Sequence, residues 1–201
     1  SHELRTPIAR MATQLENLLH SKELNESSRK VLSSISEDIY QLSDVVTSLL
    51  LLSKIDNTTE LVALPYLRLD EILFQCVEDM KRSFPDLKFN FNIAGDTPEE
   101  IHLEVKADET LLKIALHNLI KNAYLYSDDK TVSAGLRQTA DSIVLSIRNN
   151  GPVPDVEEKQ KLFEAFTRGS NTKMVSGSGL GLRIVQRILQ YFKATVSFET
   201  P

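Results

Sequence analysis

The chain has 201 residues, of which 41% are apolar and 25% are charged, the composition of an ordinary soluble globular protein. Its single cysteine, Cys76, excludes an intramolecular disulfide and a cysteine-cluster metal site. A formal net charge of -5 argues against a nucleic-acid-binding protein, because such proteins present a basic face to phosphates. The longest apolar run, Leu49–Leu52, is far shorter than the ~20 residues that cross a bilayer.

The first part of the chain predicts two long helices. Apolar residues recur at steps of four and three from Leu4 to Leu18, and again from Val31 to Leu49 in a helix that can reach Asp56. Asn25 is a candidate N-cap of the second helix. Two such helices cannot enclose their own apolar stripes, so residues 1–57 are expected to form a hairpin that dimerises into a four-helix bundle. A monomeric hairpin packed on the rest of the chain is the alternative.

After a linker at residues 58–65, residues 66–201 contain a mixture of strand and helix patterns. Strands and helices follow one another without strict βαβ alternation, which predicts an α+β fold with an α/β sandwich. The expected strands are 66–69, 88–93, 101–105, 131–137, 142–148 and 195–198, and the expected helices are 70–83, 108–127 and 180–191. Five of the seven glycines fall within residues 151–181, whereas the first 94 residues have none. This contrast also indicates two architectures.

The first candidate site is at the start of the chain. His2 and Thr6 are four residues apart on one helix face, and the carboxylate of Glu3 is next to the imidazole. Pro7 removes one helical hydrogen bond, a cost of ~3 kcal/mol that a helix interior has little reason to accept. An imidazole beside a carboxylate can act as a nucleophile with its base. The plain alternative is a solvated histidine near a chain start.

The second candidate site is an asparagine pair. Asn118 and Asn122 are one helical turn apart on an otherwise apolar helix, although asparagine is a poor helix former. Two neutral amide oxygens suit Mg²⁺, which completes its shell with water and phosphate. The alternative is a pair that hydrogen-bonds the neighbouring backbone.

The third is a long glycine-rich loop. It runs from Gly151 to Gly179 and opens the last helix through Gly177-Ser178-Gly179-Leu180-Gly181. A helix N-terminus offers free N–H groups to anions, and such long loops are usually lids or disordered segments. Arg168 can meet phosphate oxygens, or else is a solvated charge.

Together these segments resemble the H, N, G1, F and G2 boxes of the sensor histidine kinases of two-component systems. The matching segments, in order, are Ser1–Pro7, Asn118–Ala123, Asn149–Gly151, Leu162–Phe166 and Gly177–Leu182. The resemblance implies a dimerisation and phosphotransfer hairpin joined to a GHKL-type ATP-binding domain. It also implies phosphorylation of His2 by Mg-ATP, and transfer of the phosphoryl group to an aspartate of a response-regulator receiver domain.

Individual roles follow from the same resemblance. Glu3 corresponds to the base for His2, and Thr6 to the residue that positions water when the regulator is dephosphorylated. The other matches are Asn118 and Asn122 for magnesium and phosphate, Tyr126 for the aromatic that closes the N box, Asn149 and Gly151 for the G1 box, and Gly177, Gly179, Leu180 and Gly181 for the lid hinge.

The sequence departs from the family at three positions. Asn149 replaces the aspartate that accepts a hydrogen bond from adenine, Val153 replaces the second G1 glycine, and Leu125 replaces a basic residue. A neutral acceptor is weaker than a charged one, and a loss of about 1–2 kcal/mol would weaken ATP binding some five- to thirtyfold.

Three functions therefore stay open: an active autokinase, a phosphatase-biased sensor with weak ATP binding, and a non-catalytic signalling dimer. Because the sequence opens on Ser1-His2 without an initiator methionine, we expect the cytoplasmic part of a larger membrane receptor, attached to the membrane through segments outside this sequence.

Overall fold

A computed structural model of the whole chain describes residues 2–19, 25–33, 35–36, 39, 42, 46, 50, 64–94, 102–139, 141–155, 159, 161–164 and 180–200. None of the helices in these ranges is long and apolar enough to span a membrane. Residues 58–63 of the linker predicted at 58–65 lie outside the described residues, as do Arg168, Gly177 and Gly179.

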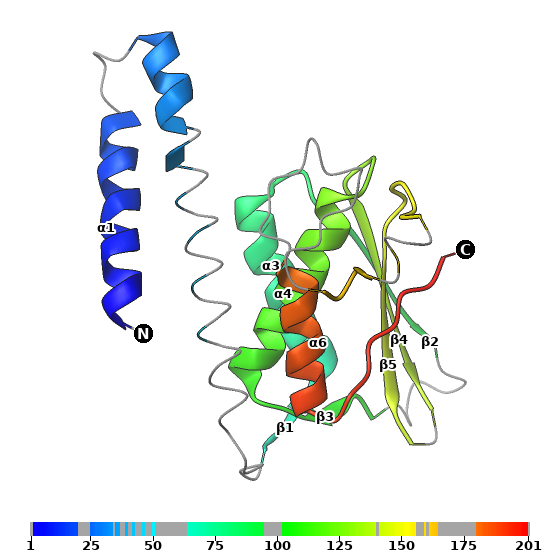
Figure 1. Cartoon of the computed structure of the whole chain (residues 1–201). Helices are drawn as coiled ribbons and strands as arrows, with labels where there is room; N and C mark the ends of the chain where they lie inside the picture. The colour runs from blue at the N-terminus through cyan, green and yellow to red at the C-terminus, as the bar shows by residue number, and fades with distance from the viewer. Residues whose placement is uncertain are drawn as a thin grey trace.

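The N-terminal part is helical, as predicted. Helix α1 runs from His2 to Leu19 with Pro7 inside it, and residues 26–33 form a further helical segment (Figure 1). Asn25 is the predicted cap, since its Oδ1 accepts a hydrogen bond from the Ser28 backbone N–H at 2.7 Å. Within one chain the α1 stripe is only partly covered, because Ile8 and Leu15 are buried while Met11 and Leu18 are exposed.

The C-terminal part is built on two sheets. Strands β1 (Tyr66–Arg68) and β3 (Glu104–Lys106) form an antiparallel pair. The larger sheet has the order β2 (Lys88–Ala94), β4 (Thr131–Gln138), β5 (Ile143–Arg148), with β2 parallel and β5 antiparallel to β4. The predicted hairpin of β4 and β5 is therefore confirmed.

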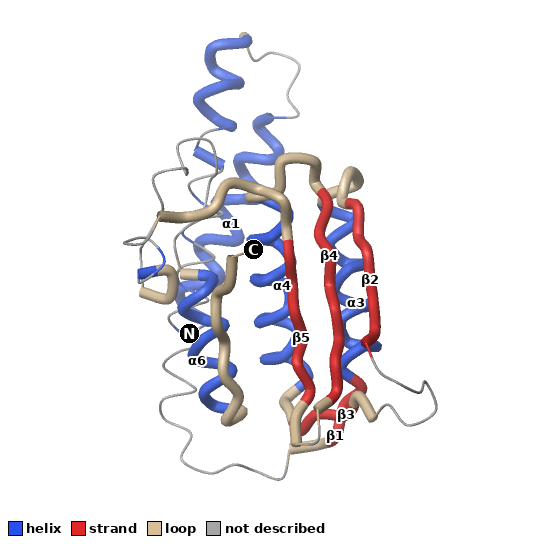
Figure 2. The backbone as a smooth tube through the Cα atoms, turned by 90° about the vertical axis from the view of Figure 1, so that its right-hand side faces the viewer, coloured by secondary structure: helices blue, strands red, loops and turns tan. Residues whose placement is uncertain are grey.

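Three helices lie on one face of the larger sheet: α3 (Leu69–Ser83), α4 (Glu109–Leu125) and α6 (Gly181–Tyr191) (Figures 1 and 2). The alternating residues Val132, Ala134 and Leu136 of β4 are buried in the core formed with α3 and α4. Helix α6 packs on α4 through a second apolar cluster around Ala115 and Val185. The predicted α/β sandwich is present, and α4 lies at its centre, in contact with both α3 and α6.

Two strand predictions need correction. The strand expected at 101–105 begins only at Glu104, because the backbone N–H of His102 donates to the Gln138 side chain. The strand expected at 195–198 is wrong, since residues 194–200 form no strand. Lys193 adopts a φ of 57° that ends α6, and the side chains after it are mostly exposed, so the apolar alternation there is not matched by burial.

Candidate functional site

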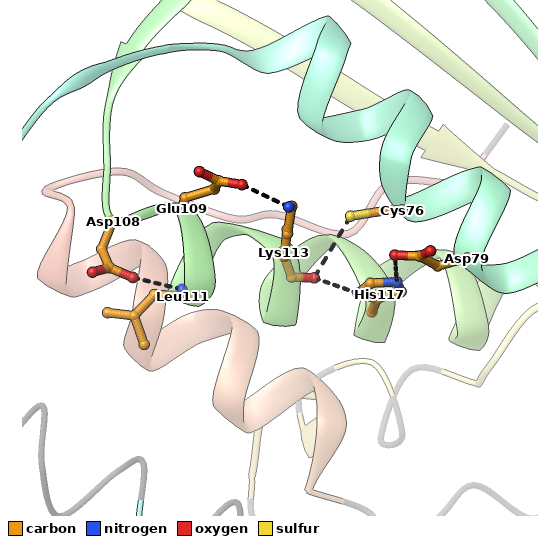
Figure 3. Close-up of polar contacts among 7 residues, drawn as sticks. All are labelled: Cys76, Asp79, Asp108, Glu109, Leu111, Lys113 and His117. Carbon is orange, nitrogen blue, oxygen red and sulfur yellow. Dashed lines mark hydrogen bonds and ion pairs between the residues drawn. The ribbon is translucent and has the colours of Figure 1, made fainter.

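Helix α4 positions the asparagine pair. Asp108 directly precedes the helix, and its carboxylate caps the first turn by accepting the Leu111 backbone N–H at 2.9 Å (Figure 3). Asn118 and Asn122 follow on the same helix and are both half-buried. The Nδ2 of Asn118 donates to the Ile114 carbonyl at 2.8 Å, so this side chain does bond the neighbouring backbone. Only the nitrogen is used in that bond, which leaves Oδ1 as an oriented acceptor.

The start of α6 meets the Asn118 side chain directly. A Cβ atom added to Gly181 would lie 2.8 Å from Asn118 Oδ1, closer than real Cβ atoms come to an oxygen. Leu180, the preceding residue, is fully buried in the cluster between α4 and α6 and fixes this approach. Its apolar side chain cannot cap the helix, and the first turn of α6 contains no acidic residue. The N-terminal end of α6 thus lies against the amide oxygen of Asn118 in the N box. Because this helix start has neither a side-chain cap nor an acidic residue, it suits an anion.

A second close approach joins the end of α4 to the segment after β5. The Nδ2 of Asn149 donates to the Tyr126 carbonyl at 3.1 Å. A Cβ atom on Gly151 would lie 1.5 Å from the same carbonyl oxygen. Gly151 is thus required by the space that the Tyr126 backbone occupies. Because its nitrogen is used, Asn149 has its Oδ1 left to accept a hydrogen bond.

Sequence reasoning missed Ser127, which follows Tyr126. Its hydroxyl donates to Asn150 Oδ1 at 2.8 Å and accepts the Thr131 backbone N–H at 3.0 Å. The signal was available, since a small hydroxyl residue directly ends the apolar helix pattern and Asn150 is adjacent to the G1 asparagine.

The opposite face of α4 is structural. Lys113 pairs with Glu109 at 2.6 Å, and the ring of His117 lies 3.0 Å from the Lys113 carbonyl and 4.0 Å from Asp79 on α3 (Figure 3). The hydrogen bond that the Lys113 ammonium donates to Glu109 raises the pKa of Lys113. Burial raises the pKa of the Cys76 thiol to about 11, so this cysteine is not a nucleophile at neutral pH.

The structure describes the side chains of only some of the remaining predicted residues. The backbones of His2 and Glu3 lie in α1, but their side chains are outside the described ones, whereas Thr6 is exposed on α1. Of the residues that depart from the family pattern, Leu125 packs against the main core, which explains an apolar residue there, and Val153 is exposed.

Two protein families match the chain. Residues 1–58 match the His Kinase A (phospho-acceptor) domain, and residues 107–201 match the histidine kinase-, DNA gyrase B- and HSP90-like ATPases. The first match contains α1 and the second contains α4, β4, β5 and α6.

Curated relatives match along nearly the whole chain. The sensor-like histidine kinase SenX3 of Mycobacterium bovis is 30% identical over 199 residues, which are 98% of this chain and 48% of the relative. The sensor protein kinase PmrB of Pseudomonas aeruginosa is 29% identical over 191 residues, covering 94% of this chain and 39% of the relative. The chain thus spans about half the length, or less, of these relatives.

Solved structures have the same fold. Full-length ShkA, solved with AMPPNP, gives a TM-score of 0.67 at 22% identity over 94% of this chain and 39% of that one. Histidine kinase AdeS of Acinetobacter baumannii gives 0.65 at 22% identity over 99% of this chain and 91% of that one.

With a phospho-acceptor match at one end, an ATPase match at the other and kinase relatives along its length, the chain belongs to the sensor histidine kinases of two-component systems.

Proposed function

We propose that the chain is a kinase core that phosphorylates itself on His2 with ATP and passes the phosphoryl group to an aspartate of a response-regulator receiver domain. The observation that carries this proposal is the convergence of two distant segments on α4: Gly181 on Asn118, and Asn149 with Gly151 on Tyr126. Asn118 and Tyr126 are about 12 Å apart along the helix rise. Asn149, the acceptor for the adenine base, therefore lies at the Tyr126 end of α4. The helix start at Gly181, which suits an anion, lies at the Asn118 end.

The residues at the Asn118 end fit a magnesium nucleotide. Asn118 and Asn122 would hold Mg²⁺ through neutral amide oxygens, and the orientation of Asn118 Oδ1 by the Ile114 contact supports this assignment. When bound, the ion neutralises phosphate charge. The N–H groups at Gly181, with Arg168 and the hinge glycines Gly177 and Gly179, would bind phosphate oxygens.

Transfer to His2 would proceed by positioning. One imidazole nitrogen attacks the γ-phosphorus, the bond to the β,γ-bridging oxygen breaks, and ADP leaves with that electron pair. Glu3 holds the proton of the other ring nitrogen, which favours attack by the first. Thr6, exposed on α1, would position water when the phosphorylated regulator is hydrolysed.

The chain would work as a homodimer. The partly exposed stripe of α1, with exposed Val31 and Leu42 on the following segment, supports burial against a second copy. Since the relatives are named sensor kinases and exceed this chain in length, we place it in the cytoplasmic part of a membrane receptor.

Labelling with γ-³²P ATP and Mg²⁺ tests the proposal. The wild-type chain should acquire acid-labile label, and His2→Gln should abolish it. His102→Gln is the matched control, because its side chain is exposed and it lies outside the H box in the sequence, and it should label like the wild type. Label retained in His2→Gln would refute the assignment.

The Asn149 position favours a second candidate, a sensor whose main activity is dephosphorylation of its regulator. Restoring Asp should strengthen ATP binding at least fivefold if the missing charge limits affinity. The contact with Tyr126 opposes that gain, because a carboxylate cannot donate to a carbonyl. Calorimetric titration of the wild type and Asn149→Asp decides, since equal affinities would remove the premise for this candidate.

A further inference from the structure

Ser127 is one of two polar residues that are buried within the described part of the chain, and it is only 3% exposed. It lies where three segments meet: the end of α4, the turn that enters β4, and the residues that leave β5. A buried hydroxyl needs hydrogen-bond partners, and each of these segments supplies one. Ser127 therefore connects, through its hydrogen bonds, elements that contribute to the proposed nucleotide site.

The hydrogen bonds of Ser127 identify its principal partner. A serine hydroxyl has one proton to donate, and three acceptor oxygens surround it: Asn150 Oδ1 at 2.8 Å, the Thr131 carbonyl at 3.0 Å and Asp129 Oδ1 at 3.1 Å. Its own oxygen accepts the Thr131 backbone N–H. Asp129 Oδ1 already accepts that N–H at 2.9 Å. The shortest contact leads to Asn150, which ties the segment after β5 to the end of α4.

This tie is one of three between the same short segments. Asn149 donates to the Tyr126 carbonyl, Asn150 accepts from Ser127, and the Gly151 backbone closes directly on the Tyr126 carbonyl. Three consecutive residues of the G1 segment are thus held against two consecutive residues at the end of α4. Of these side chains only Ser127 is buried, so it anchors the others to the core.

We propose that Ser127 is a positioning residue for nucleotide binding, acting through Asn150 to set where the G1 segment lies relative to the N box. The inference rests on the proposed function. Ser127 does not contact the nucleotide; it fixes the distance between the base acceptor Asn149 and the amide oxygens of Asn118 and Asn122. Loss of the tie should therefore weaken nucleotide binding more than it slows phosphoryl transfer.

The test compares Ser127→Ala, Asn150→Ala and their double variant in the 201-residue chain. Each single variant should raise the Kd for Mg-ATP and the KM for autophosphorylation by about five- to tenfold, with kcat within twofold of wild type. The double variant should be no weaker than the weaker single variant, because both remove one interaction. Ser127→Thr keeps the hydroxyl and should restore the wild-type KM. Since Asn150 is exposed, Asn150→Ala keeps the test valid if Ser127→Ala folds poorly.

Thr139→Ala is the matched control. Its hydroxyl also bridges a turn, to Ser142 between β4 and β5, but this turn is at the far end of the hairpin from the G1 segment. It should lower the melting temperature and leave KM unchanged. The inference is overturned if Ser127→Ala and Asn150→Ala only lower the melting temperature, or if their effects on Kd multiply independently. A wild-type chain that neither binds nor uses Mg-ATP would instead overturn the proposed function, and the inference with it.

Discussion

The contact of Gly151 with Tyr126 supplies the sharpest prediction. A Cβ atom added at Gly151 would lie 1.5 Å from the Tyr126 carbonyl oxygen and 2.7 Å from its carbon. Ordinary van der Waals contact begins at 3.4 Å, so the G1 segment would have to retreat by about 2 Å. The obstacle is backbone, which cannot rotate away as a side chain can.

That displacement is large enough to break two hydrogen bonds. The Asn149 bond to Tyr126 spans 3.1 Å and the Ser127 bond to Asn150 spans 2.8 Å, and neither survives a separation of this size. At about 1 kcal/mol each, Gly151→Ala should lower the free energy of unfolding by about 2 kcal/mol. Because Asn149 moves with the segment, affinity for Mg-ATP should fall tenfold or more.

Chemical denaturation and calorimetric titration measure both quantities. Gly135→Ala is the matched control, since the close contact of its Cβ would be with the rotatable Ser146 hydroxyl at 2.8 Å, while the backbone oxygen of Asn92 lies at an ordinary 3.9 Å, and it should change stability by less than about 0.5 kcal/mol. If Gly151→Ala matched this control in stability and kept wild-type affinity, the reasoning from close approach would be refuted.

Three further outcomes are expected. Gly181→Ala should leave the melting temperature equal or higher, because alanine favours a helix, yet weaken Mg-ATP binding by displacing Asn118 Oδ1; unchanged affinity in titration would contradict this. Cys76 should resist iodoacetamide at pH 8 in the folded chain and react rapidly in urea, as mass spectrometry can show, because it is fully buried and its pKa is about 11. Hydrogen bonding from Arg68 lowers the pKa of Asp70, so this carboxylate stabilises the fold at neutral pH and that contribution is lost as the pH falls below about 4. Asp70→Asn should therefore lower stability by well under 1 kcal/mol at pH 7, and its difference from the wild type should shrink as the pH falls below about 4 in urea titrations, whereas a difference that stayed constant with pH would exclude this cause.

Periodicity predicted the helices and the central strands because those elements bury one face. The stripe of α4 and the alternation Val132, Ala134, Leu136 in β4 are direct consequences of packing against the core. The expected strand at 195–198 shows the limit of this reasoning. Its alternation is equally regular, but none of the strands in the described part of the chain pairs with it, and pairing depends on residues far away in sequence.

Each predicted site residue belongs to a short local motif, whereas the contacts between motifs depend on the fold and are not visible in the sequence. The interpretation of Asn149 as a weakened aspartate considered only its charge. The structure gives it a second partner, the Tyr126 carbonyl, for which the amide is the better group. Ser127 was missed for a related reason, because its value depends on Asn150, which β5 brings to it.

The clustered glycines have a more specific cause than backbone freedom. A glycine-rich segment suggests a mobile lid, and Gly177 and Gly179 keep that interpretation as a prediction. At Gly151 and Gly181, however, a methyl group would strike a Tyr126 backbone atom or the Asn118 amide oxygen. These two glycines therefore bring the G1 and G2 segments against α4 at fixed positions. Replacing either one should damage binding through lost contact geometry, so a lid that still moves would not rescue the variant.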